Sequence, residues 1–580
     1  MTTIADTLTD LLNTAVKAAG HGDAPVPLAP FVATADPRHG DYQTNYALRL
    51  GKAVGPNPRA VAQQLVDALP EHPALGSVEI AGPGFINVRL ADDWLGADVV
   101  ERAGKEDLGL GAPGTGRTLV IDYSSPNIAK RMHVGHLRST IIGDALARMY
   151  RFVGWNVIAD NHIGDWGTPF GMLIVAWHEW RDEAAYAEDP VAELQRLYQL
   201  FREKSADDAE LTDRARAETV KLQEGDPENR ALWQDFCRVS LEEFNGVYDR
   251  LGVKFDVVHG ESHYQQAVHP MIEDLMARGL AVEDQGAIIV PFEPEDGKGL
   301  SKNPLLIRKS DGAAMYGTTD LATVIDRMDT WAPERIIYET DVRQSLHFRQ
   351  VFAASRKMGV QTDFVHVGHG MLKFDGDVVS SRKGGGGMLN LVDVLDTAVA
   401  AARKVVDRES AELPEEERAV VAEAIGVGAV KYTDLSQNPA SDIHFDWDRM
   451  VAYEGDTAAY LLYANARCHS IFRKSDVGDL TAYTPGVILP EHEAERALAI
   501  TIARTPEAIL SATEAAKPNV LANHAFQLAK AMARFYNQCK VLDDANSTET
   551  TTSRLSLVWA TSRALETSLR LLGLAPVSRM

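Results

Sequence analysis

The sequence predicts a multidomain chain that combines α/β and all-α parts. It divides into a small α/β module at residues 1–110, a doubly wound parallel sheet at 117–397 and a helical domain at 398–580. A chain of 580 residues is too long for a single core. Strand-like and helix-like runs alternate in the middle part, which is typical of a doubly wound sheet. In the last part the apolar spacing is almost entirely helical, which indicates a helical bundle.

The first module is expected to mix helices with a small sheet. Residues 4–19 have the apolar spacing of an amphipathic helix. A second helix is expected shortly after, with Asp41 as its N-cap. Residues 78–80 and 82–88 predict two strands joined by a Gly-Pro-Gly turn. The run at 111–116, rich in glycine and proline, is a natural boundary with the following domain.

The most informative run lies where a predicted strand meets a predicted helix. Residues 118–123 are strand-like, residues 137–152 have helical spacing, and the turn between them contains His133, Gly135 and His136. A helix N-terminus offers free N–H groups and a positive dipole end to phosphate. Two histidines can donate hydrogen bonds to a triphosphate, and glycine leaves room for an adenine near the backbone. The turn therefore predicts an ATP site, although a metal site or a helix cap would also explain the run His-Val-Gly-His at 133–136 taken alone.

Composition and charge restrict the function classes without identifying one. The net charge of -24 does not point to nucleic acid, although a local basic strip can bind phosphates on an acidic protein. Cys237, Cys468 and Cys539 are far apart, so neither a disulfide framework nor a zinc site is expected. We find no signal peptide and no membrane-spanning apolar run. These observations favour a cytoplasmic protein without a membrane partner.

The turn and its flanks resemble a known family signature. The run 124–139, Ser-Ser-Pro-Asn-Ile-Ala-Lys-Arg-Met-His-Val-Gly-His-Leu-Arg-Ser, resembles that of class I aminoacyl-tRNA synthetases in the form found in arginyl-tRNA synthetases. The resemblance covers nearly the whole chain. It implies an N-terminal tRNA-contact domain, a Rossmann-like catalytic domain with a helical insertion at about 172–250, and a C-terminal anticodon-binding domain. It also implies that a monomer uses ATP, with Mg²⁺ and without zinc, to join L-arginine to tRNA(Arg), and that bound tRNA is needed for adenylate formation.

The resemblance implies a second, mobile phosphate-binding loop. Residues 378–384 are the better candidate; residues 298–303 have similar letters but come too early, and predict a surface hairpin or loop. The phosphate-binding side chains would be those of Ser380, Ser381, Arg382 and Lys383. Val378 replaces the family's first lysine, and Lys130, three residues before His133, is expected to supply that charge. The alternative is that Lys130 is a solvated surface charge.

Arginine is planar and permanently charged, so its pocket requires carboxylates and oriented acceptors. By resemblance, Tyr316 and Asp320 bind the guanidinium, and Asp122 matches an acidic position of the arginine site near the substrate. Asn127 and Gln344 match residues that hold the backbone end of the amino acid. A helix that begins at residue 316 would place the tyrosine and Asp320 on the same side. Each residue taken alone is better explained as a helix cap or a buried hydrogen-bonded group, so the prediction depends on the set.

The two ends of the chain are expected to contact RNA. By resemblance, Phe85 and Asn87 contact a base of the tRNA D-loop, the ring by stacking and the amide by edge recognition; inward packing of Phe85 is equally plausible. Residues 445–448 and 460–467 resemble the helical anticodon-binding domain.

Two other functions stay open at this point. A synthetase-like paralogue with a specialised use would have the same motifs. An inactive tRNA-binding or regulatory protein is favoured only by Val378, because both histidines are present.

Overall fold

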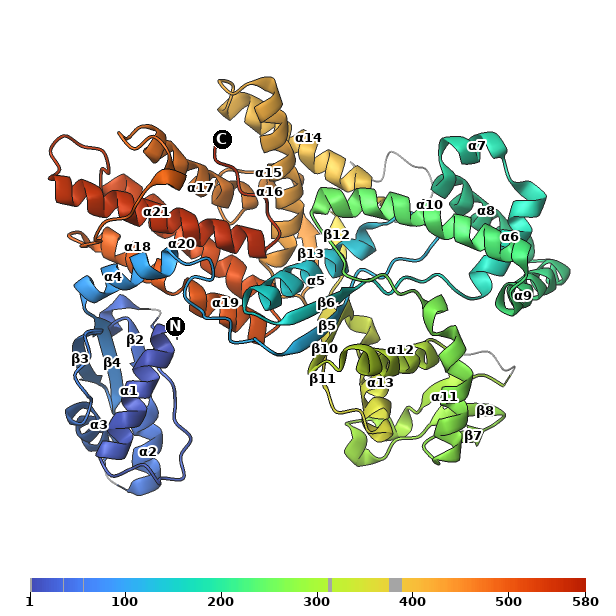
Figure 1. Cartoon of the computed structure of the whole chain (residues 1–580), viewed down its shortest axis with the longest axis horizontal. Helices are drawn as coiled ribbons and strands as arrows, with labels where there is room; N and C mark the ends of the chain where they lie inside the picture. Colours follow the sequence, from blue (N-terminus) through green and yellow to red (C-terminus); the bar gives the residue numbers. More distant parts are fainter. Residues whose placement is uncertain (1–2, 35, 56, 311–314, 375–388) are drawn as a thin grey trace. The chain divides into compact units, whose positions relative to one another are not determined.

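The computed structural model describes residues 3–34, 36–55, 57–310, 315–374 and 389–580 (Figure 1). The chain forms two compact units. The first unit contains Met1–Pro113, Val406–Ile425 and Ala452–Met580, and the second contains Gly114–Val405 and Gly426–Val451. The end of the first segment, Pro113, falls inside the glycine-rich run. Helices α14 (Leu391–Glu409) and α15 (Glu415–Leu435) contribute residues to both units.

The N-terminal module of the first unit is a small sheet covered by helices. Its strands have the order β1-β2-β4-β3 and pair antiparallel: β1 (Val32–Ala33), β2 (Tyr42–Thr44), β4 (Phe85–Leu90) and β3 (Leu75–Ala81). Its helices are α1 (Ile4–Ala18), α2 (Tyr46–Val54), α3 (Pro58–Asp67) and α4 (Asp92–Ala103). The predicted first helix and the strand–turn–strand are confirmed.

The prediction that Asp41 caps a helix is wrong. Residues 42–44 form β2 and pair with residues 86–88 of β4, and α2 begins only after Asn45. Pairing with a distant strand outweighed the local helical pattern. The buried carboxylate of Asp41 instead accepts a hydrogen bond from the Leu90 amide at 2.8 Å and pairs with Arg496 at 2.8 Å.

The C-terminal part of the first unit is a helical bundle, as predicted. Its helices are α17 (Ala458–Arg473), α18 (Glu493–Ala503), α19 (Thr505–Glu514), α20 (Pro518–Gln538) and α21 (Thr548–Leu571). Helices α17, α18 and α19 pack on α20, and α18 and α21 also pack on α4. The Arg496–Asp41 pair connects α18 to the N-terminal sheet within this unit.

The second unit is built on a parallel sheet with the order β11-β10-β5-β6. The strands are β5 (Thr118–Asp122), β6 (Asn156–Asp160), β10 (Arg335–Asp341) and β11 (Asp363–His369). From β5 the chain reaches β6 on one side and later β10 on the other. The point between β5 and β10 is thus a topological switch, where ligands bind at the carboxyl ends of the strands.

Helices and a second small sheet complete this unit. After the predicted helix α5 (Val134–Phe152), the insertion is helical as expected: α6 (Thr168–Trp180), α7 (Glu183–Glu188), α8 (Pro190–Ser205), α9 (Ala209–Glu224) and α10 (Pro227–Leu251). Helices α11 (Gln265–Ala277), α12 (Tyr316–Trp331) and α13 (Ser345–Met358) follow. Residues from them form one apolar core with Val120 and Ile336 of the sheet.

The segment 298–303 is a connection between strands, as predicted. Strands β7 (Val282–Asp284), β8 (Ala287–Val290) and β9 (Leu305–Arg308) form an antiparallel sheet. The segment joins β8 to β9 and contains a short 3₁₀ turn, Leu300–Lys302. Within the second unit, β12 (Leu372–Phe374) also pairs parallel with β13 (Ile443–Phe445), followed by α16 (Trp447–Met450).

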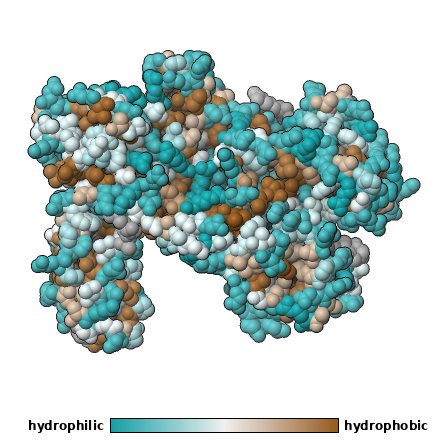
Figure 2. Space-filling model, in the orientation of Figure 1, coloured by the Kyte–Doolittle hydropathy of each residue, from teal (hydrophilic) through white to brown (hydrophobic). Residues whose placement is uncertain are grey.

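The face of the molecule in Figure 2 is largely hydrophilic, with small hydrophobic areas between, in keeping with the high net charge. Among the described residues, no helix is both long enough and apolar enough to cross a membrane.

We expect Asp41→Ala to destabilise the first unit by about 3 kcal/mol, because the mostly buried side chain of Arg496 keeps just Asp92 as an ion-pair partner among the described residues. Urea unfolding of the full chain measures the effect. The matched control is Asp36→Ala, whose ion pair with Arg38 is exposed and should contribute nothing measurable. Equal unfolding midpoints for the two variants would contradict the role of the buried pair.

Candidate active site

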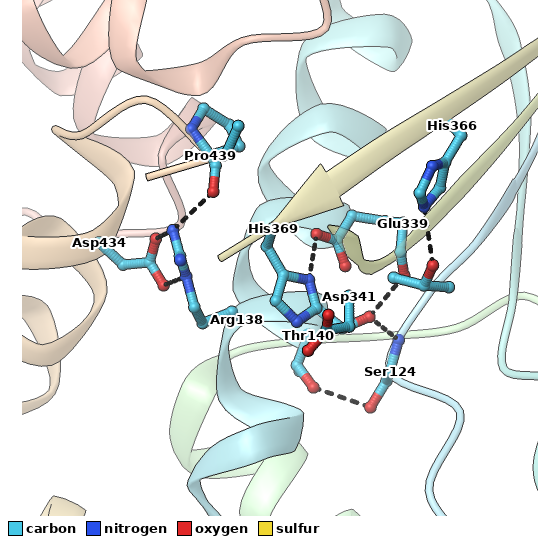
Figure 3. A network of polar contacts seen from close by, with 12 residues as sticks. Ser124, Arg138, Thr140, Glu339, Asp341, His366, His369, Asp434 and Pro439 are labelled. Atoms are coloured by element: carbon cyan, nitrogen blue, oxygen red, sulfur yellow. Dashed lines mark hydrogen bonds and ion pairs between the residues drawn. The ribbon is translucent and has the colours of Figure 1, made fainter. Parts of the chain in front are cut away.

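The loop after β5 is held in a strained conformation at the switch point. Ser124, Ser125 and Ala129 have φ values of +74°, +47° and +61°, which residues other than glycine rarely adopt. The Ser124 amide donates to Ser139 Oγ at 2.8 Å, and its hydroxyl bonds with Thr140 Oγ1 at the same distance (Figure 3). Tyr248 of the insertion also bonds with this hydroxyl at 2.8 Å. The surroundings therefore fix a backbone shape that is costly by itself, as is common at functional sites.

His133 and His136 cap α5 and at the same time present donors. Nδ1 of His133 accepts from the Gly135 amide at 3.0 Å, and Nδ1 of His136 accepts from the His133 amide at 3.2 Å. A neutral imidazole whose Nδ1 accepts must carry its proton on Nε2. The two rings stack with their centroids 4.0 Å apart. Each ring therefore has one Nε2–H group left to donate to a ligand.

Burial keeps both histidines neutral. It lowers the pKa of His133, with a further contribution from Lys130, and lowers the pKa of His136 to about 3, with help from His133 and Lys130. At neutral pH the rings are therefore hydrogen-bond donors without a net charge. The positive charge beside them comes from Lys130 instead.

Lys130 is half-buried against the insertion. Its Nζ lies 4.7 Å from the ring centroid of Tyr198 on α8, a cation–π contact. Burial and the nearby Arg202 lower the pKa of Lys130. The next residue, Arg131, also contacts this part of the chain, because its amide donates to Gln195 and its guanidinium pairs with Asp189. The insertion therefore determines where Lys130 lies relative to the histidines.

The chain after the second predicted loop contacts the histidine turn. Val378, Ser380, Ser381, Arg382 and Lys383 lie outside the described residues. The described chain resumes at Leu389, whose carbonyl accepts from the Val134 amide at 3.0 Å. The Leu391 amide donates to the Met132 carbonyl at 3.0 Å. The chain that follows the second loop therefore pairs directly with the histidine turn.

Asp122 ends β5 in a buried ion pair that the sequence analysis missed. The guanidinium of Arg327 on α12 donates to Asp122 at 2.6 Å and to Asp160, the end of β6, at 2.7 Å. Arg327 is fully buried. Burial opposes its charge, but Asp122, Tyr338 and Asp160 outweigh that effect and raise the pKa of Arg327 well above its usual value. The second oxygen of Asp122 accepts from Ser125 at 3.1 Å, so both carboxylate oxygens have partners.

Asp320 lies four residues after Tyr316, which begins α12 as predicted. Its carboxylate meets Nε2 of His347, on α13, at 2.5 Å. The sequence analysis did not select Glu261, an acidic residue in the 3₁₀ turn Glu261–Tyr264. Burial, Asp165 and Asp320 together raise the pKa of Glu261 to about 7. Acidic groups gathered in this way create a negative potential that suits a cation.

The remaining residues of the predicted arginine site are placed as follows. Asn127 is exposed and forms a parallel bridge with Gly164, whose Cα lies under the Asn127 side chain. Gln344 is exposed and precedes α13. Asp165, which is not one of the predicted arginine-site residues, accepts hydrogen bonds from both the amide and the hydroxyl of Ser262 and so braces the loop.

A buried polar network anchors α5 (Figure 3). Arg138, two residues after His136, pairs with Asp434 of α15 at 2.9 Å and donates to the carbonyl of Pro439 at 3.1 Å. On the adjacent strand ends, His369 pairs with Glu339 at 2.9 Å. The helix that presents the histidines is therefore fixed by charge-assisted bonds.

The predicted RNA contacts lie in the first unit. Phe85 is partly exposed, while Asn87 is buried and its amide oxygen accepts from Gln43 at 2.7 Å.

The bundle contains a cavity of about 340 Å³ that the sequence analysis did not predict. Its lining includes Tyr453, Tyr460, Tyr463, Arg467 and Met580. Aromatic rings and a guanidinium are the groups on which unpaired bases stack.

The prediction for residues 445–448 needs correction. They form the end of β13 and the start of α16 in the second unit, not part of the helical bundle. Pairing of β13 with β12, far away in the sequence, decides this placement.

Comparison with known proteins agrees with this architecture. Three family models match: the "Arginyl tRNA synthetase N terminal domain" at residues 6–90, "tRNA synthetases class I (R), catalytic domain" at 105–447, and the "DALR anticodon binding domain" at 461–580. The chain is 41% identical to an arginine–tRNA ligase of Fusobacterium nucleatum, over 93% of each chain. It is 41% identical to that of Saccharophagus degradans, over 98% of this chain and 99% of the relative.

A solved structure supports the same assignment. The arginyl-tRNA synthetase of Plasmodium falciparum superposes with a TM-score of 0.84 over 100% of both chains, at 26% identity. With the catalytic-domain model matching more than half of the sequence and relatives matching nearly all of it, the chain belongs to the arginyl-tRNA synthetases, a family of class I aminoacyl-tRNA synthetases.

Proposed function

We propose that the chain is an arginine–tRNA ligase, which forms arginyl-adenylate from L-arginine and ATP and transfers arginine to the 3′-terminal adenosine of tRNA(Arg). The observations that carry the proposal are the pair of neutral Nε2–H donors at the N-terminus of α5 and, in the same unit, the acidic groups around Asp320. Charging of purified tRNA(Arg) with radiolabelled arginine in a single turnover tests it. Absence of charging, with all three substrates present, would contradict it.

In the first step the carboxylate of arginine attacks the α-phosphorus of ATP, and diphosphate leaves. Negative charge grows on the phosphate oxygens, where His133, His136 and Lys130 stabilise it. Ser380, Ser381, Arg382 and Lys383 are proposed to approach the β- and γ-phosphates from the loop, since residues 389–391 pair with the histidine turn. Mg²⁺ is expected to enter with ATP, bound to its phosphates. In the second step the terminal 2′-hydroxyl attacks the carbonyl of the adenylate, and AMP leaves.

The arginine side chain is proposed to bind between α12 and the turn at Glu261. Asp320, Tyr316 and Glu261 would surround the guanidinium, and Asn127 and Gln344 would hold the amino and carboxylate end. Asp122 has both oxygens occupied by Arg327 and Ser125, so we infer that it contributes through the buried ion pair. Catalysis then depends on orientation and charge stabilisation, without a covalent enzyme intermediate.

The first unit is proposed to bind tRNA(Arg) at two places. Phe85 and Asn87 would contact the D-loop, and the cavity lined by Tyr453, Tyr460 and Tyr463 would take an anticodon base. We propose domain limits of 1–110, 117–397 and 398–580. Within the third range, residues 426–451 pack in the second unit. We also propose a cytoplasmic monomer, for which light scattering is the test of mass.

Loss of either histidine should impair adenylate formation. We expect His133→Ala and His136→Ala each to lower the rate by about 10²–10³-fold, the cost of one missing donor to a developing anion, with arginine binding little changed. ATP–diphosphate exchange at saturating tRNA measures this. His133→Asn is the matched variant, because asparagine can still cap α5 but has no group at the Nε2 position. Near-normal exchange in the alanine variants would contradict the ATP site.

Neutralising Asp320 should weaken arginine binding selectively. We expect Asp320→Asn to raise the KM for arginine about 10–100-fold, because a charge-assisted hydrogen bond is lost, while the KM for ATP stays within about twofold. Asp329→Asn is the control, since this exposed carboxylate is on the same helix. If both variants keep the arginine KM of the native chain, Asp320 is outside the pocket.

Lys130 is proposed to supply the positive charge that Val378 cannot provide. We expect Lys130→Ala to lower adenylate formation about 10–100-fold and V378K in that background to restore part of it, because either ammonium can reach the same phosphates. Lys204→Ala is the control, since Lys204 is an exposed lysine over Trp180 of the same insertion. Unchanged adenylate formation in Lys130→Ala would refute the proposed role of Lys130. A loss that V378K does not restore would refute the proposal that a lysine at either position can supply the charge.

A further inference from the structure

A cluster of three potential metal ligands lies outside the groups that the proposed reaction uses. Across the described ranges, His259, His263 and Asp326 are the group of this kind whose ligand atoms all lie within 4.8 Å of one another. The histidines flank the start of the 3₁₀ turn Glu261–Tyr264, and Asp326 comes from α12. Residues far apart in the sequence therefore bring two imidazoles and one carboxylate together.

The three groups are close but do not satisfy one another. Nε2 of His263 lies 3.9 Å from Asp326 Oδ2, which is too long for a hydrogen bond. Nδ1 of His259 is buried and has no hydrogen-bond partner among the residues described. A buried polar atom without a partner is unfavourable, because it has lost its hydrogen bonds to water. A cation placed between the three side chains would give the buried nitrogen of His259 a partner and would bind the other two groups as well. Protonation of one ring could not link all three groups.

The chemistry of the ligands selects the kind of cation. Two imidazoles and a carboxylate suit Zn²⁺ and similar first-row divalent ions, whereas Mg²⁺ and Ca²⁺ prefer oxygen ligands alone. Three protein ligands leave a fourth position for water.

The site requires a small closure before it can hold an ion. Ligand atoms bound at about 2.0–2.2 Å can be no more than about 4.4 Å apart. The imidazole rings of His259 and His263 are stacked at 4.1 Å with an angle of 4° between them. One ring must therefore turn about its Cβ–Cγ bond, so that both lone pairs point to the same ion. His263 is exposed, which leaves room for its ring to turn away from His259.

We propose that His259, His263 and Asp326 bind one zinc-class divalent cation, which connects the turn at 261–264 to α12. This proposal departs from the zinc-free protein that the family resemblance implies. Two contacts give the site a structural consequence. Asp326 directly precedes Arg327, and the His259 amide donates to Asp160 Oδ1 at 3.4 Å. Both Arg327 and Asp160 belong to the buried ion pair at the ends of β5 and β6. The ion is a clamp on this part of the fold and takes no part in the chemistry.

The test uses the full, untagged chain after treatment with EDTA. We expect Zn²⁺ titrated in a calorimeter to bind with one high-affinity equivalent, and Co²⁺ to develop the visible absorption of a tetrahedral or five-coordinate site. Thermal unfolding should shift upward with Zn²⁺, because an ion that binds only the folded state stabilises it. These readouts do not depend on aminoacylation, so they stay informative if the proposed function fails.

Variants decide whether this cluster is the site. His263→Ala should raise the Kd for Zn²⁺ at least about tenfold and abolish the thermal shift, and Asp326→Asn should weaken binding by a similar factor. His269→Ala is the matched control, since it removes an exposed histidine from the neighbouring helix α11. His263 is exposed, so its loss should leave folding intact. Unchanged binding in His263→Ala, or no binding at about 0.1 mM Zn²⁺ in the native chain, would overturn the proposal.

Discussion

The buried Arg327 is the interaction on which the second unit depends. Parallel strands bring Asp122 and Asp160 to the same edge of the sheet, where two buried carboxylates would repel each other. The guanidinium of Arg327 neutralises both, and its charge lies 5.3 Å from the ring of Tyr338. Burying these charges costs several kcal/mol of desolvation, so the group is stable only when complete.

This ion pair also determines the position of α12 relative to the sheet. Because Arg327 is bound to the ends of β5 and β6, the first turns of the same helix have a fixed place near His347 and the turn at Glu261. The helix therefore transmits the geometry of the strand ends to the acidic pocket. A change at Arg327 would alter both the stability of the fold and the placement of Asp320.

The histidine turn shows that capping a helix and binding a nucleotide are compatible roles. The Nδ1 atoms of His133 and His136 satisfy amide groups of the first turn of α5, and this leaves the Nε2–H groups to a ligand. The cap thus fixes both the tautomer and the direction of the donors. The insertion adds the charge, since Tyr198 of α8 holds the ammonium of Lys130 beside the turn.

The sequence by itself determined the local elements and the family. The strand–turn–helix around the histidines, the connection at 298–303 and the start of α12 at Tyr316 follow from short-range patterns, because periodicity, turns and caps are local. What depends on pairing between distant segments needed the tertiary structure. Residues 42–44 and 443–445 became strands only because β4 and β12 were there to pair with them. Arg327, Glu261 and the cluster of His259, His263 and Asp326 gave no sequence pattern, since burial and charge from remote parts of the chain define them.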